Sequence, residues 1–294
     1  MKDIEDILQK LERLAARAME RNPHSAGVVS AFRPLIMARA RLVDSLDLAG
    51  RGEFTLDENL FRQGIPVARQ NAWFREDDPF APVALSLISP LKTGFPDLNS
   101  TWERFTGLID GKKIVLPDFF RSYPAGGDDL LASWAQLLEA DVRIPAFLAS
   151  SVARVILERR ALDWAGLMQD FEWEKGYCPL CGSPPNISKH LEGTGQRWLH
   201  CPRCNHEWRF RRVVCPCCEN DDQKTMSYFT IDEKEQESAF GCEMCKSYLV
   251  TVLKVSGTAE FDPDIAALSL SHIDIIMQEK GYLPMVQPEW STFA

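Results

Sequence analysis

The first 177 residues of the sequence contain no cysteine and none follows residue 245, although the chain of 294 residues has nine. No apolar stretch approaches the length of a membrane span, and the N-terminus has a charged amphipathic pattern rather than that of a signal peptide. We therefore expect a cytoplasmic protein without a membrane span. In that compartment thiols stay reduced, and clustered cysteines more often bind metal than form disulfides.

Catalytic motifs are also missing from the sequence. It has no nucleophile elbow, no phosphate-binding glycine loop and no HExxH motif. An excess of basic charge is missing too, because the formal net charge is −9 and the segment 178–245 has eight basic and ten acidic residues. Proteins that coat phosphates usually carry the opposite sign. The sequence therefore predicts a protein that is not an enzyme, and its acidity argues against a nucleic-acid partner.

Eight of the nine cysteines form four Cys-x-x-Cys pairs. Two such pairs supply the four thiolates of a tetrahedral site, with metal–sulfur bonds of about 2.3 Å for zinc. When consecutive Cys-x-x-Cys pairs are combined in chain order, the number of residues between the two pairs of each site is near that of a metal ribbon. The sequence therefore predicts two sites for two metal ions. A cross-braced pairing, first with third and second with fourth, is the alternative. The predicted ligands are Cys178, Cys181, Cys201 and Cys204 in one site, and Cys215, Cys218, Cys242 and Cys245 in the other.

Three further residues lie beside these pairs and are open to more than one interpretation. Cys217 is the cysteine left over, inside the third pair, and we expect an inert spare rather than a substitute for Cys218 or a redox thiol. His200 and His206 flank the second pair. With four thiolates available for each site, we expect both histidines to lie outside the ligand set.

Helical periodicity dominates residues 1–170. Apolar side chains recur at spacings of three and four, and we expect one all-α domain. In the last of its helices, Leu162 belongs to the apolar stripe, whereas Arg154, Glu158 and Arg159 are expected to face solvent. The expected helices cover about 4–19, 28–48 (kinked or begun at Pro34), 80–92, 98–110, 128–140 and 145–168.

After residue 170 turn residues and β-formers replace this periodicity, and short strands are expected between the cysteine pairs. The segments 171–212 and 213–256 are predicted to be two copies of a small ribbon, similar to rubredoxin or a zinc ribbon, in which ions act as staples. Residues 257–294 are predicted to form a closing helix, opened by Asp262 and Pro263 and ended by Gly281, and a tail. The predicted fold class is α+β.

Arginines and aromatic residues alternate around the second and third pairs. Arg197, Arg203, Arg209, Arg211 and Arg212 are interleaved with Trp198, Trp208 and Phe210. Such residues bind single-stranded nucleic acid in some proteins. A nucleic-acid-binding zinc-ribbon protein is therefore the alternative function, but the surrounding acidity favours protein contact or charge compensation at the thiolate sites.

The cysteine-rich half resembles one known family. The motifs that carry the resemblance begin at Tyr177 (Tyr-Cys-Pro-Leu-Cys), Trp198 (Trp-Leu-His-Cys-Pro-Arg-Cys), Val214 (Val-Cys-Pro-Cys-Cys) and Phe240 (Phe-Gly-Cys-Glu-Met-Cys). Together with the tail from Asp264 to Tyr282, they are similar to the FdhE formate dehydrogenase accessory proteins. The resemblance covers about residues 177–283.

The resemblance implies a cytoplasmic, non-catalytic maturation factor that contacts the catalytic subunit of respiratory formate dehydrogenase before export. It also implies rubredoxin-like sites and hence favours iron, with zinc as the alternative, because thiolate sites accept both metals. The four Cys-x-x-Cys pairs match the family's four motifs one for one. The sequence leaves the oligomeric state open, and it is compatible with a homo-oligomer.

Overall fold

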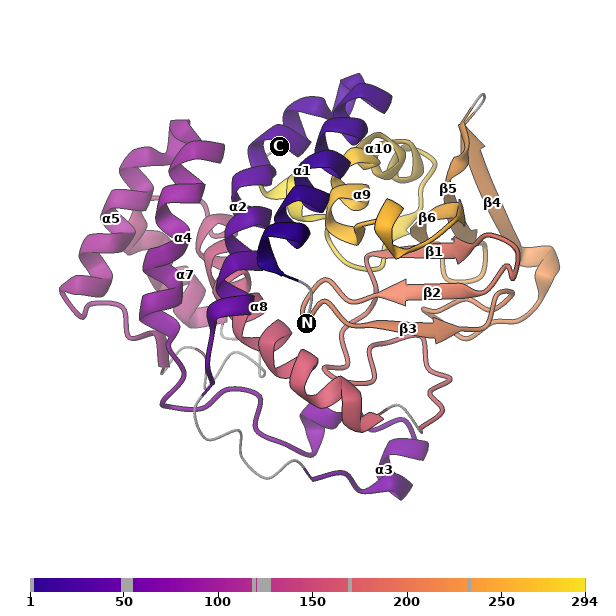
Figure 1. The fold of residues 1–294 in the computed structure, drawn as a ribbon, viewed down its shortest axis with the longest axis horizontal. Helices are drawn as coiled ribbons and strands as arrows, with labels where there is room; N and C mark the ends of the chain where they lie inside the picture. Colours follow the sequence, from indigo (N-terminus) through magenta and orange to yellow (C-terminus); the bar gives the residue numbers. More distant parts are fainter. Residues whose placement is uncertain are drawn as a thin grey trace.

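Helices form the N-terminal half of the chain, and one β-sheet with two further helices forms the C-terminal half (Figure 1). The computed structural model describes residues 3–48, 55–117, 120, 128–168, 171–231 and 234–293. The mixed architecture confirms the predicted α+β class. Among the described residues, no helix is both long and apolar enough to cross a membrane.

The N-terminal helices follow the predicted apolar stripes. Asp3 caps the first helix by accepting from the backbone N–H of Glu5, and Leu8, Leu11 and Leu14 form its buried face. Pro34 lies inside the second helix and does not end it. The helices are α1 (Ile4–Arg21), α2 (Ala26–Ser45), α3 (Glu58–Arg62), α4 (Phe80–Gly94), α5 (Asn99–Asp110), α7 (Asp128–Leu138) and α8 (Arg143–Ala165).

Helix α8 is buried on almost every side. It packs against α2, α4 and α7, and it extends toward the cysteine-rich half. The prediction of a solvent face at Arg154, Glu158 and Arg159 was therefore wrong: the side chain of Arg154 is only 6% exposed, and those of Glu158 and Arg159 are 15% and 23% exposed. Leu162, predicted in the apolar stripe, is 59% exposed instead.

The strands of both predicted ribbons join in a single seven-stranded sheet. Its order is β3-β2-β1-β6-β5-β4, and β7 pairs with β6. The strands are β1 (Ile187–Leu191), β2 (Arg197–His200), β3 (Glu207–Phe210), β4 (Met226–Ile231), β5 (Lys234–Cys242), β6 (Ser247–Val255) and β7 (Leu283–Pro284).

The sheet shows a repeat of one motif. In each copy two knuckles and three antiparallel strands alternate in the same order, β1–β3 in the first and β4–β6 in the second. The copies meet where β1 runs parallel to β6, with Ile187 opposite Val250. The expected duplication is therefore present, but the copies share one sheet rather than forming two separate ribbons. The domain limits at 170, 212 and 256 stay predictions.

The predicted closing helix consists of two helices, α9 (Pro263–Ser269) and α10 (Ser271–Glu279), with a break at Leu270. As predicted, Asp262 caps the first of them. Helix α9 packs against α1 and α2, whereas α10 packs against β5 and β6, so the break lets one segment follow both halves (Figure 1). The tail then returns to the helical half, where the Phe293 ring stacks on Phe95 with centroids 4.0 Å apart.

Candidate metal centres

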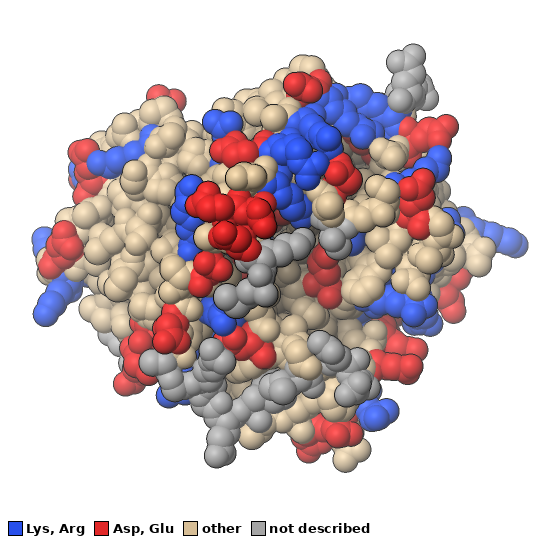
Figure 2. Space-filling view, in the orientation of Figure 1, with Lys and Arg blue, Asp and Glu red and all other residues tan. Residues whose placement is uncertain are grey.

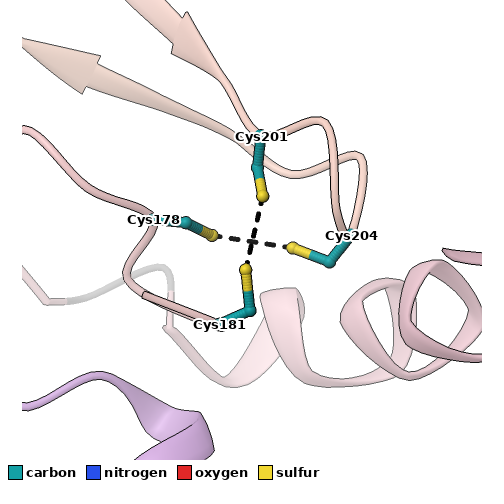
Figure 3. Close-up of side chains that lie close together, drawn as sticks. All are labelled: Cys178, Cys181, Cys201 and Cys204. Atoms are coloured by element: carbon teal, nitrogen blue, oxygen red, sulfur yellow. Dashed lines mark hydrogen bonds between the residues drawn. The ribbon is translucent and has the colours of Figure 1, made fainter. Parts of the chain in front are cut away.

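The first two cysteine pairs converge on one point. The sulfurs of Cys178, Cys181, Cys201 and Cys204 all lie within 4.8 Å of one another, and Figure 3 shows the four side chains pointing toward a common centre. The Sγ atoms of Cys178 and Cys204 are 3.6 Å apart, and those of Cys181 and Cys201 are 3.3 Å apart. Cys181 is partly buried and the other three are buried.

The last two pairs form a second cluster of the same kind. The sulfurs of Cys215, Cys218, Cys242 and Cys245 also lie within 4.8 Å of one another. The Sγ–Sγ distances are 3.7 Å between Cys215 and Cys245 and 3.8 Å between Cys218 and Cys242. Here Cys218 is exposed and Cys245 half-buried. The structure thus brings the eight predicted residues together in chain order, not in the cross-braced arrangement.

The four knuckles share one backbone conformation. The residue after the second cysteine has a positive φ in each of them: 76° at Gly182, 58° at Asn205, 57° at Glu219 and 56° at Lys246. At the first three, the N–H of this residue donates to the carbonyl oxygen of the knuckle's first cysteine at 2.9–3.0 Å. Local hydrogen bonds therefore determine the turn, and the turn places both sulfurs of a pair on the same side of the backbone.

Backbone contacts fix the first cluster to the helical half. The N–H groups of Val67 and Ala68 donate to the carbonyl oxygens of Pro179 and Leu180, at 3.0 and 2.8 Å. The hydroxyl of Tyr177 donates to the carbonyl oxygen of Gly64 at 2.7 Å. A Cβ on Gly176 would lie 1.9 Å from the carbonyl oxygen of Pro216, so glycine is required where the first knuckle passes the third.

The charges of the thiols depend on one another. Burial holds the pKa of Cys178 and Cys204 well above the usual value for a thiol. Burial also acts to raise the pKa of Cys201, but hydrogen bonds from the three neighbouring sulfurs outweigh it, and that pKa lies well below the usual value. One thiolate in the first cluster is therefore stabilised by its neighbours, which is the start of an anionic ligand set.

A metal ion fits this donor set. For metal–sulfur bonds of about 2.3 Å, the edges of a tetrahedron of sulfurs are about 3.8 Å long. The observed separations of 3.3–3.8 Å are close to this length, and far from the 2.05 Å of a disulfide. All nine cysteines are free. Each cluster could hold one ion, whereas ligation by these eight sulfurs stays a prediction.

The residues of uncertain role have different environments. Nδ1 and Nε2 of His200 lie 2.8 Å from Oδ1 of Asn186 and 2.7 Å from Oδ1 of Asn205, so the ring is engaged away from the sulfurs. Burial lowers the pKa of His200 and of His206. Neither histidine belongs to a metal-compatible group among the described residues. Cys217 is exposed and lies outside the second group of four.

Arg197 has a role that its place in the arginine–aromatic pattern obscured. Its side chain is only 1% exposed, lies 4.5 Å from the centroid of the Phe240 ring and donates to the carbonyl oxygen of Val214 at 3.1 Å. Val214 precedes Cys215, so a positive charge is buried beside the second cluster. In the sequence, the alternation of Arg197 with Trp198 was the signal for a special role of Arg197. This alternation did not show which of the two side chains is buried.

A family model described as "FdhE, central domain" matches residues 177–212, which contain the first cluster. Among curated proteins, the chain is similar to an FdhE homolog of Aquifex aeolicus (34% identical over 116 residues, covering 38% of this chain and 40% of the relative). It is also similar to an FdhE homolog of Edwardsiella ictaluri (32%, covering 49% and 52%) and to FdhE of Escherichia coli K12 (29%, covering 50% and 53%). The chain thus spans about half the length of these relatives, or less.

A solved structure extends the likeness to almost the whole chain. The crystal structure of the FdhE protein from Pseudomonas aeruginosa matches with a TM-score of 0.62 at 22% identity, covering 96% of this chain and 94% of that protein. At this identity the match shows the fold. It includes the helical half, for which the sequence offered no motif.

Proposed function

We propose that this chain is an FdhE-family protein and that it serves as a metal-binding accessory protein for maturation of respiratory formate dehydrogenase. The family model, the curated relatives and the fold of the solved structure together support this proposal. In this proposal it acts in the cytoplasm and contacts the catalytic subunit of that enzyme. It has no catalytic activity of its own.

The pair of four-thiol clusters is the observation that carries the proposal. Bound ions would cross-link the two knuckles in each half of the sheet and so stabilise it. The chain supplies all four tetrahedral positions in each cluster, so no position is left for a substrate. This favours a structural or redox role of the bound ions over hydrolysis or group transfer.

The resemblance favours iron at both sites, with zinc as the alternative. The measurement is the metal content and visible spectrum of freshly isolated protein. Two iron ions per chain with the strong absorption of ferric tetrathiolate would support a rubredoxin-like protein. Two zinc ions and a colourless protein would support zinc ribbons, and a chain that binds neither metal would contradict the proposal.

Contact with the client is tested by capture on the immobilised catalytic subunit. We expect the wild type to be retained, and a Cys178→Ser/Cys181→Ser variant to be retained less, because the first cluster would no longer be closed. Cys217→Ser is the matched control, since it removes a cysteine outside both groups of four. If the wild type is not retained on the catalytic subunit, the proposed contact with that subunit is contradicted. If all three proteins are retained equally, the first cluster is not needed for this contact.

The structure offers little support for the nucleic-acid alternative. Trp208 and Phe210 are buried, as is Arg197, so this part of the pattern presents no stacking platform. Figure 2 shows basic and acidic side chains intermixed on one face, with a denser basic group over α1. On α1, Arg13 and Arg17 pair with Glu260. We expect no binding to single-stranded DNA at low salt, where a phosphate-binding protein binds most tightly.

A further inference from the structure

The two clusters differ in how firmly they are enclosed. The first is fixed to the helical half by the backbone bonds at Val67 and Ala68, and three of its cysteines are buried. The second belongs to the β4–β6 half of the sheet, with Cys218 exposed and Cys245 half-buried. An ion in the second cluster would therefore be the more accessible of the two.

The second cluster also has a fifth thiol at its exposed side. Cys217 lies in the same knuckle as Cys218, and its Sγ accepts a hydrogen bond from Oγ of Ser247 at 3.3 Å. Ser247 lies two residues after the predicted ligand Cys245, so this hydrogen bond places the Cys217 sulfur beside the knuckle that carries Cys242 and Cys245. Both Cys217 and Cys218 are exposed, so neither side chain is held in place by surrounding core.

We propose that Cys217 is a replacement ligand of the second cluster, and that it makes the ion held there exchangeable while the ion in the first cluster stays fixed. This inference rests on the proposed metal binding, but it concerns a residue outside the four-motif ligand sets. It differs from the expectation that Cys217 is an inert spare, which stays the alternative that the experiment tests.

The exchange is a ligand substitution without electron transfer. The sulfur of Cys217 forms a bond to the ion as the bond from Cys218 breaks, and the proton of the Cys217 thiol passes to the departing thiolate of Cys218. Coordination number and net charge are unchanged. Since thiolates are the ligands of such sites, a fifth thiol next to Cys218 lowers the barrier to release of that ligand from the ion.

The experiment uses full-length protein loaded with zinc and freed of excess metal. We expect two ions per chain in the wild type, in Cys217→Ser and in Cys218→Ser, because each single variant keeps four thiols at the second cluster. The Cys217→Ser/Cys218→Ser variant should keep one. Cys181→Ser is the matched control: the first cluster has no fifth thiol, so this single change should reduce the content to one ion.

A kinetic measurement completes the test. When a chromophoric chelator is added to the zinc-loaded wild type, we expect one ion to leave in a fast phase and the other in a slow phase. Cys217→Ser should slow the fast phase by roughly tenfold, an effect of the size seen when groups next to metal ligands are changed.

Three outcomes would overturn the inference: one ion in Cys218→Ser, two ions that leave the wild type at the same rate, or an unchanged fast phase in Cys217→Ser. If the wild type holds two ions, any of these three outcomes would overturn the inference and leave the proposed function intact. A wild type that holds no ion would contradict both.

Discussion

The side chain of Asn205, in the second knuckle, donates from Nδ2 to Oε1 of Glu158 on α8 at 2.6 Å. The Oδ1 atom of Asn205 accepts from Nη2 of Arg154 at 3.3 Å and lies 2.7 Å from Nε2 of His200. One amide thus joins the knuckle that carries Cys204 to the longest helix of the N-terminal half. Because this network is largely buried, the geometry of the first cluster and the packing of α8 depend on each other.

Replacing Asn205 tests this link. Asn205→Ala removes the hydrogen bond to the buried Glu158 carboxyl and places alanine at a φ of 58°, and we expect it to lower the free energy of unfolding by about 2–4 kcal/mol. Urea unfolding followed by tryptophan fluorescence measures the change. Glu219→Ala is the control at a φ of 57° with an exposed side chain: glutamate and alanine both have a Cβ, so the change removes only an exposed ion pair with Lys175 and should cost less than about 1 kcal/mol. Equal losses would contradict the link.

A second prediction concerns the buried ion pair between α8 and α9. Nη2 of Arg154 lies 2.5 Å from Oδ2 of Asp264, and their side chains are 6% and 16% exposed. Arg154→Met would leave this carboxylate buried without its cation, and we expect a loss of about 3–5 kcal/mol in unfolding free energy. The exposed pair of Arg13 with Glu260 is the control, and Arg13→Met should cost less than about 1 kcal/mol. If both substitutions cost the same, Arg154 does not join the two halves.

The elements that the sequence predicted are those set by local rules. The stripe of α1 follows from the spacing of Leu8, Leu11 and Leu14, and the knuckles follow from short hydrogen bonds around each cysteine pair. Both signals lie within a few residues of the atoms they concern, so they survive in the sequence alone.

The missed features are set by contacts between distant segments. The parallel pairing of β1 with β6 joins residues about sixty positions apart, and no local pattern records it. Charged residues predict a solvent face only when no partner arrives from elsewhere, and Asp264 supplies one for Arg154. The break at Leu270 likewise depends on two surfaces, since α9 and α10 cover different halves.

Removal of the ions should affect the two halves of the chain differently. The large apolar core lies mostly in the helical half and reaches only part of the sheet, whereas the two knuckles of each half of the sheet converge on one group of sulfurs. We expect a strong chelator to increase proteolysis within residues 177–255 while most of the helical signal in circular dichroism is kept. Cys217→Ser protein with its ions bound should resist the protease as the wild type does. Identical digestion patterns with and without chelator would show that the ions are not staples.

The pH dependence of stability should reveal Asp274. Burial raises its pKa from 3.8 to about 6, although Trp290 and Tyr248 donate to it. The folded state therefore keeps a proton that the unfolded state releases between about pH 4 and 6, so this contribution to stability is present below pH 4 and is lost as the pH rises through 6. Relative to Asp274→Asn, the wild type should lose about 2–3 kcal/mol between pH 4 and 7.

Chemical unfolding of both proteins across this pH range measures the difference. Asp77→Asn is the control for a surface carboxyl, because a hydrogen bond from Arg75 lowers the pKa of Asp77. That shift has the opposite sign, so the wild type should not lose stability relative to Asp77→Asn as the pH rises. If the free energy of unfolding of the wild type changes with pH as that of Asp274→Asn does up to pH 7, Asp274 has an ordinary pKa.

The last prediction separates the electrostatic role of Arg197 from a packing role. Its Nε and Nη2 atoms have no hydrogen-bond partner among the described residues, so burial of this cation is costly to the fold. A cluster of four thiolates around a divalent ion carries a net negative charge, however, and Arg197 offsets it from beside Cys215.

We therefore expect Arg197→Met to weaken zinc binding at the second cluster by roughly tenfold. The stability of the metal-free protein should stay the same or rise, because an apolar side chain replaces an incompletely paired cation. Competitive zinc titration and unfolding of the metal-free protein measure the two effects, and Arg209→Met, at an exposed position on β3, should change neither. If Arg197 only fills space, both quantities would fall together. Opposite changes in affinity and stability would show that the charge of Arg197 serves the metal site at the expense of the fold.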